Sequence, residues 1–106
     1  MVKDKIVLIT GGAGAIGQAT AQLLLDNGAK VVLVDINQEA LDNAKNNLKA
    51  DKDHIQVIQA DVTKEEDVKN YVKETVNTFG KIDVFFNNAG VNGPALAARV
   101  GDNLRE

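Results

Sequence analysis

Near its amino terminus the chain reads Ile6-Val7-Leu8-Ile9-Thr10-Gly11-Gly12-Ala13-Gly14-Ala15-Ile16-Gly17. The first four of these residues form a continuous, β-branched-rich run, which predicts a strand buried on both faces. Glycines and small residues follow, and from Ile16 the apolar residues recur at helical spacing. Strand, glycine turn and helix in this order predict the opening of a parallel βαβ unit. The expected buried face of this helix comprises Ile16, Ala19, Thr20, Leu23 and Leu24.

The glycine turn also predicts a site for a phosphate group. A turn that reverses the backbone, approaches a diphosphate closely and packs a helix against a strand excludes large side chains at each of these points. The free N–H groups at the helix start then favour an anion. The alternative is a tight turn without a ligand, but so many glycines closing directly into a helix exceed what a turn needs. The candidate residues are Gly11, Gly14, Ala15, Ile16 and Gly17.

The rest of the chain alternates between strand-like and helix-like segments. Apolar runs predict further strands at 31–34, 55–60 and 82–86. Asn27-Gly28 predicts the end of the first helix, because glycine adopts the left-handed conformation readily.

Two further helices lie between these strands. Asn37 is the expected N-cap of the second helix, and Thr63 with Glu66 predicts a capping box for the third. Gly80 is expected to end the third helix. The expected buried residues are Ala40, Leu41, Ala44 and Leu48 in the second helix, and Val68, Tyr71, Val72, Thr75, Val76 and Phe79 in the third.

The order βαβαβαβ with short connections predicts an α/β fold of the Rossmann type: a doubly wound parallel sheet, here partial, with strand order 3-2-1-4. Residues 1–94 are the expected dinucleotide-binding segment. Residues 95–106 carry no strand pattern and form an atypical C-terminal tail, in which 95–100 is a candidate helical turn.

Composition narrows the class of protein. The 106 residues suit one modest domain, and a net charge of −3 without a cluster of Lys and Arg argues against a nucleic-acid partner. The absence of cysteine excludes disulfides and thiolate metal sites, and no metal site is predicted. No apolar run is long enough for a signal-peptide core or a membrane span. We therefore expect a cytoplasmic protein that does not bind membranes.

Asp35 follows the second predicted strand at the separation from the glycine turn that is typical of a ribose-binding acid. A carboxylate there accepts hydrogen bonds from the ribose hydroxyls and repels a 2′-phosphate. Neither Ile36 nor Asn37 carries a positive charge that would neutralise such a phosphate. The sequence therefore predicts NAD as the cofactor in preference to NADP. The alternative role of Asp35 is that of an N-terminal helix cap or a loop acid.

Together with Asp61-Val62 and Asn87-Asn88-Ala89-Gly90, these features resemble the short-chain dehydrogenase/reductase family. The glycine segment is similar to the family pattern Thr-Gly-x-x-x-(Ala/Gly)-x-Gly, with Ala15 as its small residue, and the resemblance covers residues 5 to about 94. It implies that Asp61 binds the adenine amino group and that Val62 packs beside the ring. It also implies that Asn88, Ala89 and Gly90 line the ribose next to the nicotinamide. For Asn87 we favour a structural role.

The residues on which catalysis in this family depends do not occur here, so no catalytic residue is predicted. The family uses a Ser and a Tyr-x-x-x-Lys pair downstream of Asn-Asn-Ala-Gly, whereas this chain contains no serine. Its single tyrosine, Tyr71, lies upstream on an apolar helix face and is followed four residues later by Thr75. Asn103 comes too early for the family's helical Asn, and His54 is an expected surface residue.

The leading hypothesis is the NAD(H)-binding portion of an oxidoreductase that transfers hydride between alcohols and ketones, inactive by itself and shortened by truncation, frameshift or design. A small-molecule substrate is expected only for a full-length form. The alternatives are a stand-alone NAD-binding or sensing module and a non-functional remnant. The unpaired edge of the fourth strand and exposed apolar surface beside it favour association into oligomers.

Overall fold

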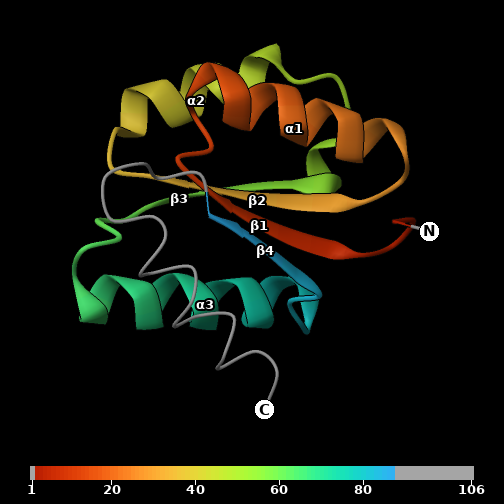
Figure 1. Ribbon diagram of the computed structural model, residues 1–106. Coiled ribbons are helices and arrows are strands. Elements are labelled where there is room, and N and C mark those ends of the chain that lie inside the picture. Colours follow the sequence, from red (N-terminus) through yellow and green to blue (C-terminus); the bar gives the residue numbers. More distant parts are fainter. Residues whose placement is uncertain (1, 88–106) are drawn as a thin grey trace.

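The computed structural model describes residues 2–87, which form a parallel sheet between two helical layers (Figure 1). The strands are β1 (Ile6–Thr10), β2 (Lys30–Asp35), β3 (Ile55–Gln59) and β4 (Val84–Asn87). The α-helices are α1 (Ala15–Asp26), α2 (Gln38–Asn47) and α3 (Glu65–Phe79), and a short 3₁₀ helix, η1, spans Lys52–His54. The strand order β3-β2-β1-β4, with every pairing parallel, confirms the predicted topology.

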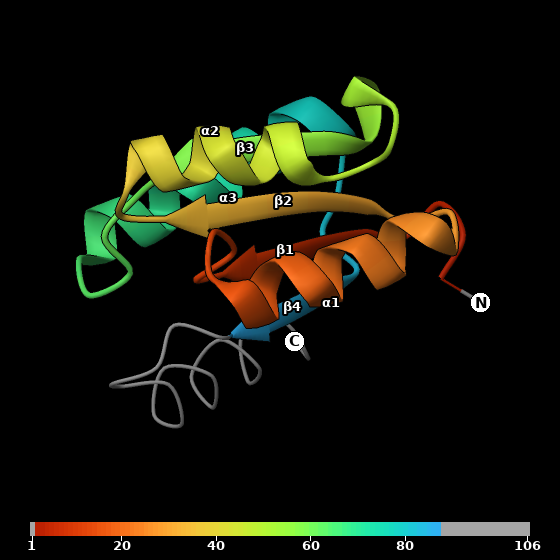
Figure 2. The same ribbon diagram turned by 90° about the horizontal axis from the view of Figure 1, so that it is seen from above.

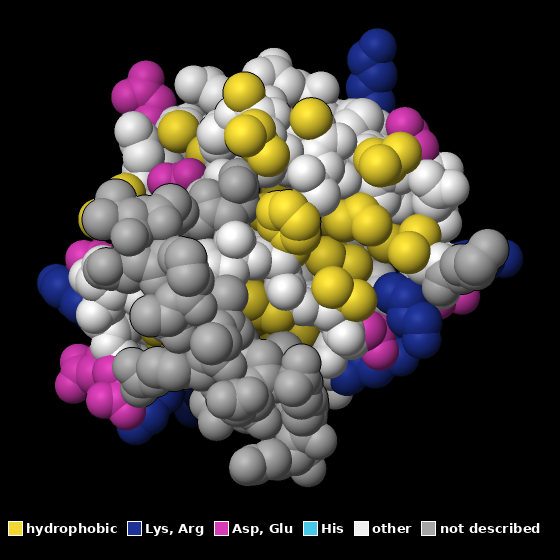
Figure 3. Space-filling view, in the orientation of Figure 1, with side chains coloured by type: hydrophobic (Ala, Val, Ile, Leu, Met, Phe, Trp, Pro, Cys, Tyr) yellow, Lys and Arg dark blue, Asp and Glu magenta, His cyan; other side chains and the backbone are white. Residues whose placement is uncertain are grey.

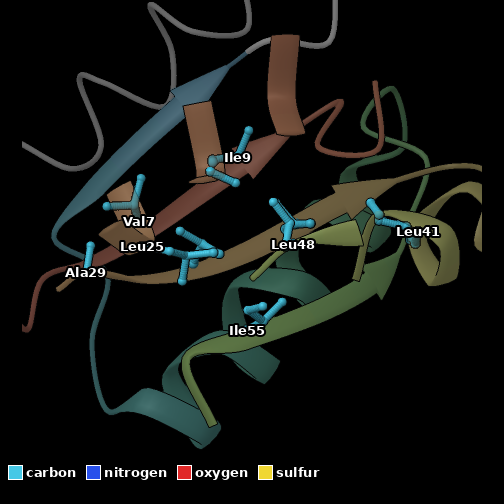
Figure 4. Close-up of a cluster of buried hydrophobic side chains, with 11 residues drawn as sticks. Val7, Ile9, Leu25, Ala29, Leu41, Leu48 and Ile55 are labelled. Carbon is cyan, nitrogen blue, oxygen red and sulfur yellow. The ribbon is translucent and has the colours of Figure 1, made fainter. Parts of the chain in front are cut away.

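The sheet is covered on both faces, as continuous apolar strands require. Helices α1 and α2 lie side by side on one face, and α3 lies on the other (Figures 1 and 2). Alternate residues of β1 point to opposite layers: Val7 and Ile9 pack with α1 and α2, whereas Leu8 packs with Tyr71 of α3. Figure 4 shows the first of these clusters, in which Leu25 of α1 and Leu41 of α2 meet strand residues.

The helix ends agree in most places with their sequence signals. The Asn37 side chain accepts a hydrogen bond from the Ala40 N–H at 3.0 Å, which confirms the predicted N-cap of α2. Gly28 and Gly80 follow α1 and α3 with φ of 88° and 86°, the left-handed conformation expected there.

The predicted capping box of the third helix is wrong. The N-cap residue of α3 is Lys64 and makes no side-chain capping bond. The Thr63 hydroxyl instead donates to the Asp61 carboxylate at 2.6 Å. The Thr63 hydroxyl therefore binds the charged Asp61 carboxylate, a stronger acceptor, and does not cap the helix.

The predicted buried face of the first helix is largely wrong, although Leu24 is partly buried against the core as expected. Gly17, Ala21 and Leu25 are its buried residues, whereas the side chains of Ile16 and Leu23 are 66% and 65% exposed. The helix is rotated in this way because Gly17 must lie against the backbone of the glycine turn. A Cβ atom on Gly17 would lie 2.6 Å from the Gly11 carbonyl oxygen.

Strand β4 lies at the edge of the sheet and pairs only with β1 among the strands described. Its start is tied to β1 by Asp83, whose carboxylate accepts the Ile6 N–H at 2.8 Å. Phe85 packs toward α3, but Val84 and Phe86 are exposed. Figure 3 shows hydrophobic side chains gathered in the middle of this side of the molecule, between the helical layers. The predicted apolar surface is therefore present beside β4, and within residues 2–87 the outer edge of this strand has no strand partner.

Candidate functional site at the carboxyl ends of the strands

The glycine turn connects β1 to α1 at the carboxyl end of the sheet. Gly11 has a φ of 65°, which a residue with a side chain adopts only at a cost. The Gly12 N–H donates to the Val34 carbonyl at 3.1 Å, and the Gly14 N–H returns to the Gly11 carbonyl at 3.2 Å. These bonds fold the turn back on itself and fix the direction in which α1 starts.

Two glycines of the turn are required by close approach. At Gly17 the clash would be with the Gly11 carbonyl oxygen, as described above. At Gly12 a Cβ atom would lie 2.8 Å from the Cβ atom of Leu33. Sequence reasoning assigned Gly12 no separate role, because its neighbour Leu33 comes from the next strand and is visible only in the folded chain.

The first turn of α1 offers backbone donors without protein partners. The first helical bond runs from the Gln18 N–H to the Gly14 carbonyl at 2.9 Å. Within residues 2–87, the N–H groups of Ala15, Ile16 and Gly17 donate to no protein acceptor. No acidic residue occupies the first turn, and Gly14 provides no side-chain cap. The helix start can therefore hold an anionic group by free N–H donors and the helix dipole.

Asp35 lies beside this turn, at the carboxyl end of β2. One carboxylate oxygen accepts the Ala13 N–H at 3.2 Å, and the other accepts the Asn37 N–H at 3.2 Å. Each carboxylate oxygen keeps acceptor capacity for a further donor. The structure thus brings together the turn and the acid that the sequence singled out. The sequence does not predict the hydrogen bond from Ala13, because its donor is a backbone N–H group that every residue except proline has.

The ends of β2 and β3 are joined at the same edge of the sheet. The Ala60 N–H donates to the Asp35 carbonyl at 3.0 Å, and the Gln59 side-chain amide donates to the Ile36 carbonyl at 3.1 Å. The side chain of Ile36 is 63% exposed, so an apolar surface lies next to Asp35.

Asp61 and Val62 follow β3 in a tight turn. The Thr63 side chain and backbone N–H both donate to one Asp61 carboxylate oxygen, at 2.6 and 2.9 Å. These bonds hold the pKa of the Asp61 carboxyl below its usual range, so the group is ionised at neutral pH. Val62 is half-buried against the core on the α3 side. The turn-forming role expected for Asp61 is present, and its second carboxylate oxygen makes no protein hydrogen bond within residues 2–87.

Asn87 ends β4 next to β1. Its side-chain oxygen accepts the Thr10 hydroxyl at 2.8 Å, which agrees with the structural role favoured for it. The predicted site residues Asn88, Ala89 and Gly90 lie outside the described residues, as does the 95–106 tail.

Tyr71 is far from solvent and belongs to the core, as its apolar helix face predicted. Its side chain is fully buried and stacks at a tilt against Phe85, with ring centroids 6.3 Å apart. Its hydroxyl makes no hydrogen bond to the residues that the structure describes, and burial raises the pKa of Tyr71 to about 12. His54 is half-buried at the end of η1.

In 2–87, no group of three or more His, Asp or Glu side chains is placed to hold a metal ion. None of the helices in that part of the chain has the length and apolar character to cross a membrane.

Comparisons with known proteins agree with this fold and this arrangement of motifs. The family model for short chain dehydrogenases matches residues 5–104. Short-chain dehydrogenase reductase 5 of Arabidopsis thaliana is 48% identical over 90 residues, which are 85% of this chain and 34% of that protein. The chain thus spans about a third of the length of such curated relatives.

Solved structures show the same similarity. A crystal structure of NAD⁺-bound xylitol dehydrogenase matches with a TM-score of 0.78 and 39% identity, over 86% of this chain and 35% of that one. A short chain dehydrogenase from Bacillus anthracis matches with a TM-score of 0.84 and 26% identity, over 97% of this chain and 51% of that one. With the glycine turn, the strand order and the family model in agreement, the chain belongs to the short-chain dehydrogenase family.

Proposed function

We propose that this chain is the NAD(H)-binding portion of a short-chain dehydrogenase. The observation that carries the proposal is the start of α1, which lies close to Asp35. There, the N–H groups of Ala15, Ile16 and Gly17 have no protein acceptor within residues 2–87. Those donors would hold the diphosphate, and Gly11, Gly14 and Gly17 would let it approach the backbone. The helix start has room for this group, since a Cβ atom on Gly14 would contact only the Gly11 carbonyl oxygen, at 3.5 Å, among the described residues.

Asp35 supports NAD in preference to NADP. Its carboxylate would accept hydrogen bonds from the adenosine ribose hydroxyls, and its negative charge would repel a 2′-phosphate. The residues that follow it, Ile36 and Asn37, provide no compensating positive charge.

The remaining contacts extend from the ends of β2, β3 and β4. Ile36 and Val62 would provide apolar surface for the adenine. The Asp61 carboxylate oxygen that does not bind Thr63 would accept a hydrogen bond from the adenine amino group. Asn88, Ala89 and Gly90 would line the ribose next to the nicotinamide. These three assignments rest on the family pattern, because the residues lie beyond the described part of the chain.

In a full-length form we propose hydride transfer between the alcohol and carbonyl forms of a small-molecule substrate. The bound nicotinamide supplies the hydride acceptor or donor, and this chain's residues hold and orient the cofactor. The 106 residues contain no serine, and their single tyrosine is buried in the core. We therefore propose that they do not turn over substrate by themselves. We further propose a cytoplasmic location and self-association through β4.

Calorimetric titration of the chain with NAD⁺ and with NADP⁺ tests the proposal. We expect NAD⁺ to bind at least about tenfold more tightly than NADP⁺, a difference of about 1.4 kcal/mol. Asp35→Asn should reduce or abolish that preference, because it removes the charge that repels the 2′-phosphate. Asp51→Asn, an equal charge change at an exposed residue before η1, is the matched control and should leave the preference intact.

This titration and an activity assay distinguish a cofactor-binding portion from a non-functional remnant and from an active enzyme. A folded chain that binds neither nucleotide would refute the cofactor role and favour a non-functional remnant. Tighter binding of NADP⁺ would refute the assignment made from Asp35. Dehydrogenase turnover by the chain alone, on any of a panel of small alcohols, would refute the proposal that it is inactive by itself.

A further inference from the structure

A second candidate site lies at the opposite end of the sheet from the glycine turn. A groove of about 500 Å³ opens beside the amino ends of β2 and β3, and its lining includes Lys30, Lys45 and Lys52. We call it the lysine groove. Because β3 is the outer strand of the order β3-β2-β1-β4, the groove is on the edge of the sheet remote from β4.

The lysine groove has a positive net charge, whereas the chain as a whole is negative. The three lysines face one acidic residue of the lining, Asp53, which gives the groove a local net charge of +2, whereas the whole chain carries −3. The three lysines and Asp53 form no ion pair within residues 2–87. Within the described part of the chain, their ammonium groups therefore have no carboxylate at ion-pair distance. A dianion would match this excess, and a phosphate monoester carries about −1.5 to −2 at pH 7.

The lysine groove also has an apolar wall. Ile55, Val57 and Phe79 contribute to its lining, and the Lys30 ammonium lies 5.9 Å from the centre of the Phe79 ring. The carbonyl oxygen of the Gln56 side chain is buried there and accepts no hydrogen bond. Ligand sites in proteins commonly combine such apolar lining with a few polar groups that fix orientation.

We propose that the lysine groove binds a small organic phosphate monoester with an aromatic or aliphatic body. The phosphate would lie among the lysine ammonium groups, and the apolar body would pack against Phe79. This site is separate from the proposed dinucleotide site, which lies at the carboxyl ends of the strands, so both would be occupied together.

Titration of ¹⁵N-labelled protein with phenyl phosphate, followed by NMR, tests this inference. We expect amide shifts confined to residues around the lysine groove, with a dissociation constant below about 1 mM. NAD⁺ added afterwards should leave these shifts in place. The double variant Lys45→Gln, Lys52→Gln should weaken binding about five- to tenfold, since each exposed charge pair contributes only modestly.

The matched control is the double variant Lys69→Gln, Lys73→Gln, which removes the same charge from exposed positions of α3 outside the groove. Inorganic phosphate, which lacks the apolar body, should bind at least threefold more weakly than phenyl phosphate. Shifts spread over the whole surface, equal loss of binding in the two double variants, or displacement by NAD⁺ would overturn the proposal. Failure of NAD⁺ to bind would leave this result unaffected, because the two titrations follow different amides.

Discussion

Gly17 is the residue at which the geometry of the glycine turn is most demanding. A methyl group there would lie 2.6 Å from the Gly11 carbonyl oxygen, and neither partner is a flexible side chain. We expect Gly17→Ala to lower the free energy of unfolding by about 1–3 kcal/mol, the usual cost of overpacking. Urea denaturation followed by circular dichroism measures this loss.

Gly14→Ala is the control for that substitution. A Cβ atom on Gly14 would meet the Gly11 carbonyl oxygen at 3.5 Å, an ordinary contact, and Gly14 has an extended backbone at φ −76°. Its cost should not exceed about 1 kcal/mol, the cost of alanine at an N-cap. A smaller loss for Gly17→Ala than for Gly14→Ala would contradict the role assigned to Gly17.

Because of Tyr71, the stability of the fold should depend on pH in the alkaline range. Burial raises the pKa of Tyr71 from its ordinary value of about 10 to about 12, so the folded state holds the proton more tightly than the unfolded state. The resulting stability is fully present below pH 10 and is lost as the pH rises through 12. We expect the urea midpoint of the native chain to fall between pH 10 and 12 by more than that of Tyr71→Phe.

At neutral pH the same substitution should not destabilise the fold. The Tyr71 hydroxyl is buried without a hydrogen bond, so its removal relieves a desolvation penalty of about 1 kcal/mol while the ring is kept. A Tyr71→Phe variant that unfolds at markedly lower urea at pH 7 would indicate that the hydroxyl has a partner in solution.

Among the helices, α2 depends most visibly on its cap. The Asn37 side chain accepts the Ala40 N–H at 3.0 Å. Within the described residues, no other side chain accepts a backbone hydrogen bond from the amino-terminal turn of α2. Asn37→Ala should cost about 1 kcal/mol of unfolding free energy in thermal or urea denaturation. Asn46→Ala, at an exposed position inside the same helix, should cost nothing, because alanine has the higher helix propensity.

Strand β4 is the element through which copies of the chain are expected to associate. Within residues 2–87 it pairs only with β1; it contains no Lys or Pro between Val84 and Asn87, and Val84 and Phe86 are exposed. Such edges pair readily with other chains. We expect sedimentation velocity to show a concentration-dependent increase in mass, which Phe86→Lys reduces.

Val76→Lys provides the comparison for this experiment. Val76 is similarly exposed at 41%, but it lies on α3 and not on the strand edge. Equal suppression of association by both substitutions would show that general charge, and not the β4 edge, controls the mass.

For the molecule as a whole, cofactor binding should be visible as stabilisation. A ligand that binds only the folded chain adds about 2.7 kcal/mol at a concentration of 100 times its Kd. For a chain of about 100 residues this corresponds to a rise in Tm of roughly 10 °C or more. Thermal unfolding with NAD⁺ at saturation measures the rise, and the Gly17→Ala variant should show a smaller one. An unchanged Tm at saturating NAD⁺ would contradict a specific folded-state site.

Much of this molecule could be predicted because its signals are local. Continuous apolar runs placed the four strands, and helices between them led to the parallel order β3-β2-β1-β4. Asn37, Gly28 and Gly80 marked helix ends correctly, since capping and left-handed turns depend on a few neighbouring residues. The proximity of Asp35 to the glycine turn followed from the same topology, because parallel strands bring their carboxyl ends together.

Other features depend on partners that are distant along the chain. The rotation of α1, which exposes Ile16 and Leu23, is set by contact between Gly17 and the backbone of Gly11. An apolar count along the helix does not contain that contact. Likewise, Lys30, Lys45 and Lys52 come from three separate elements, and no spacing in the sequence marks them as one groove. Periodicity and turn chemistry are properties of neighbouring residues, whereas close backbone approach and shared charge arise only when the packed layers bring remote residues together.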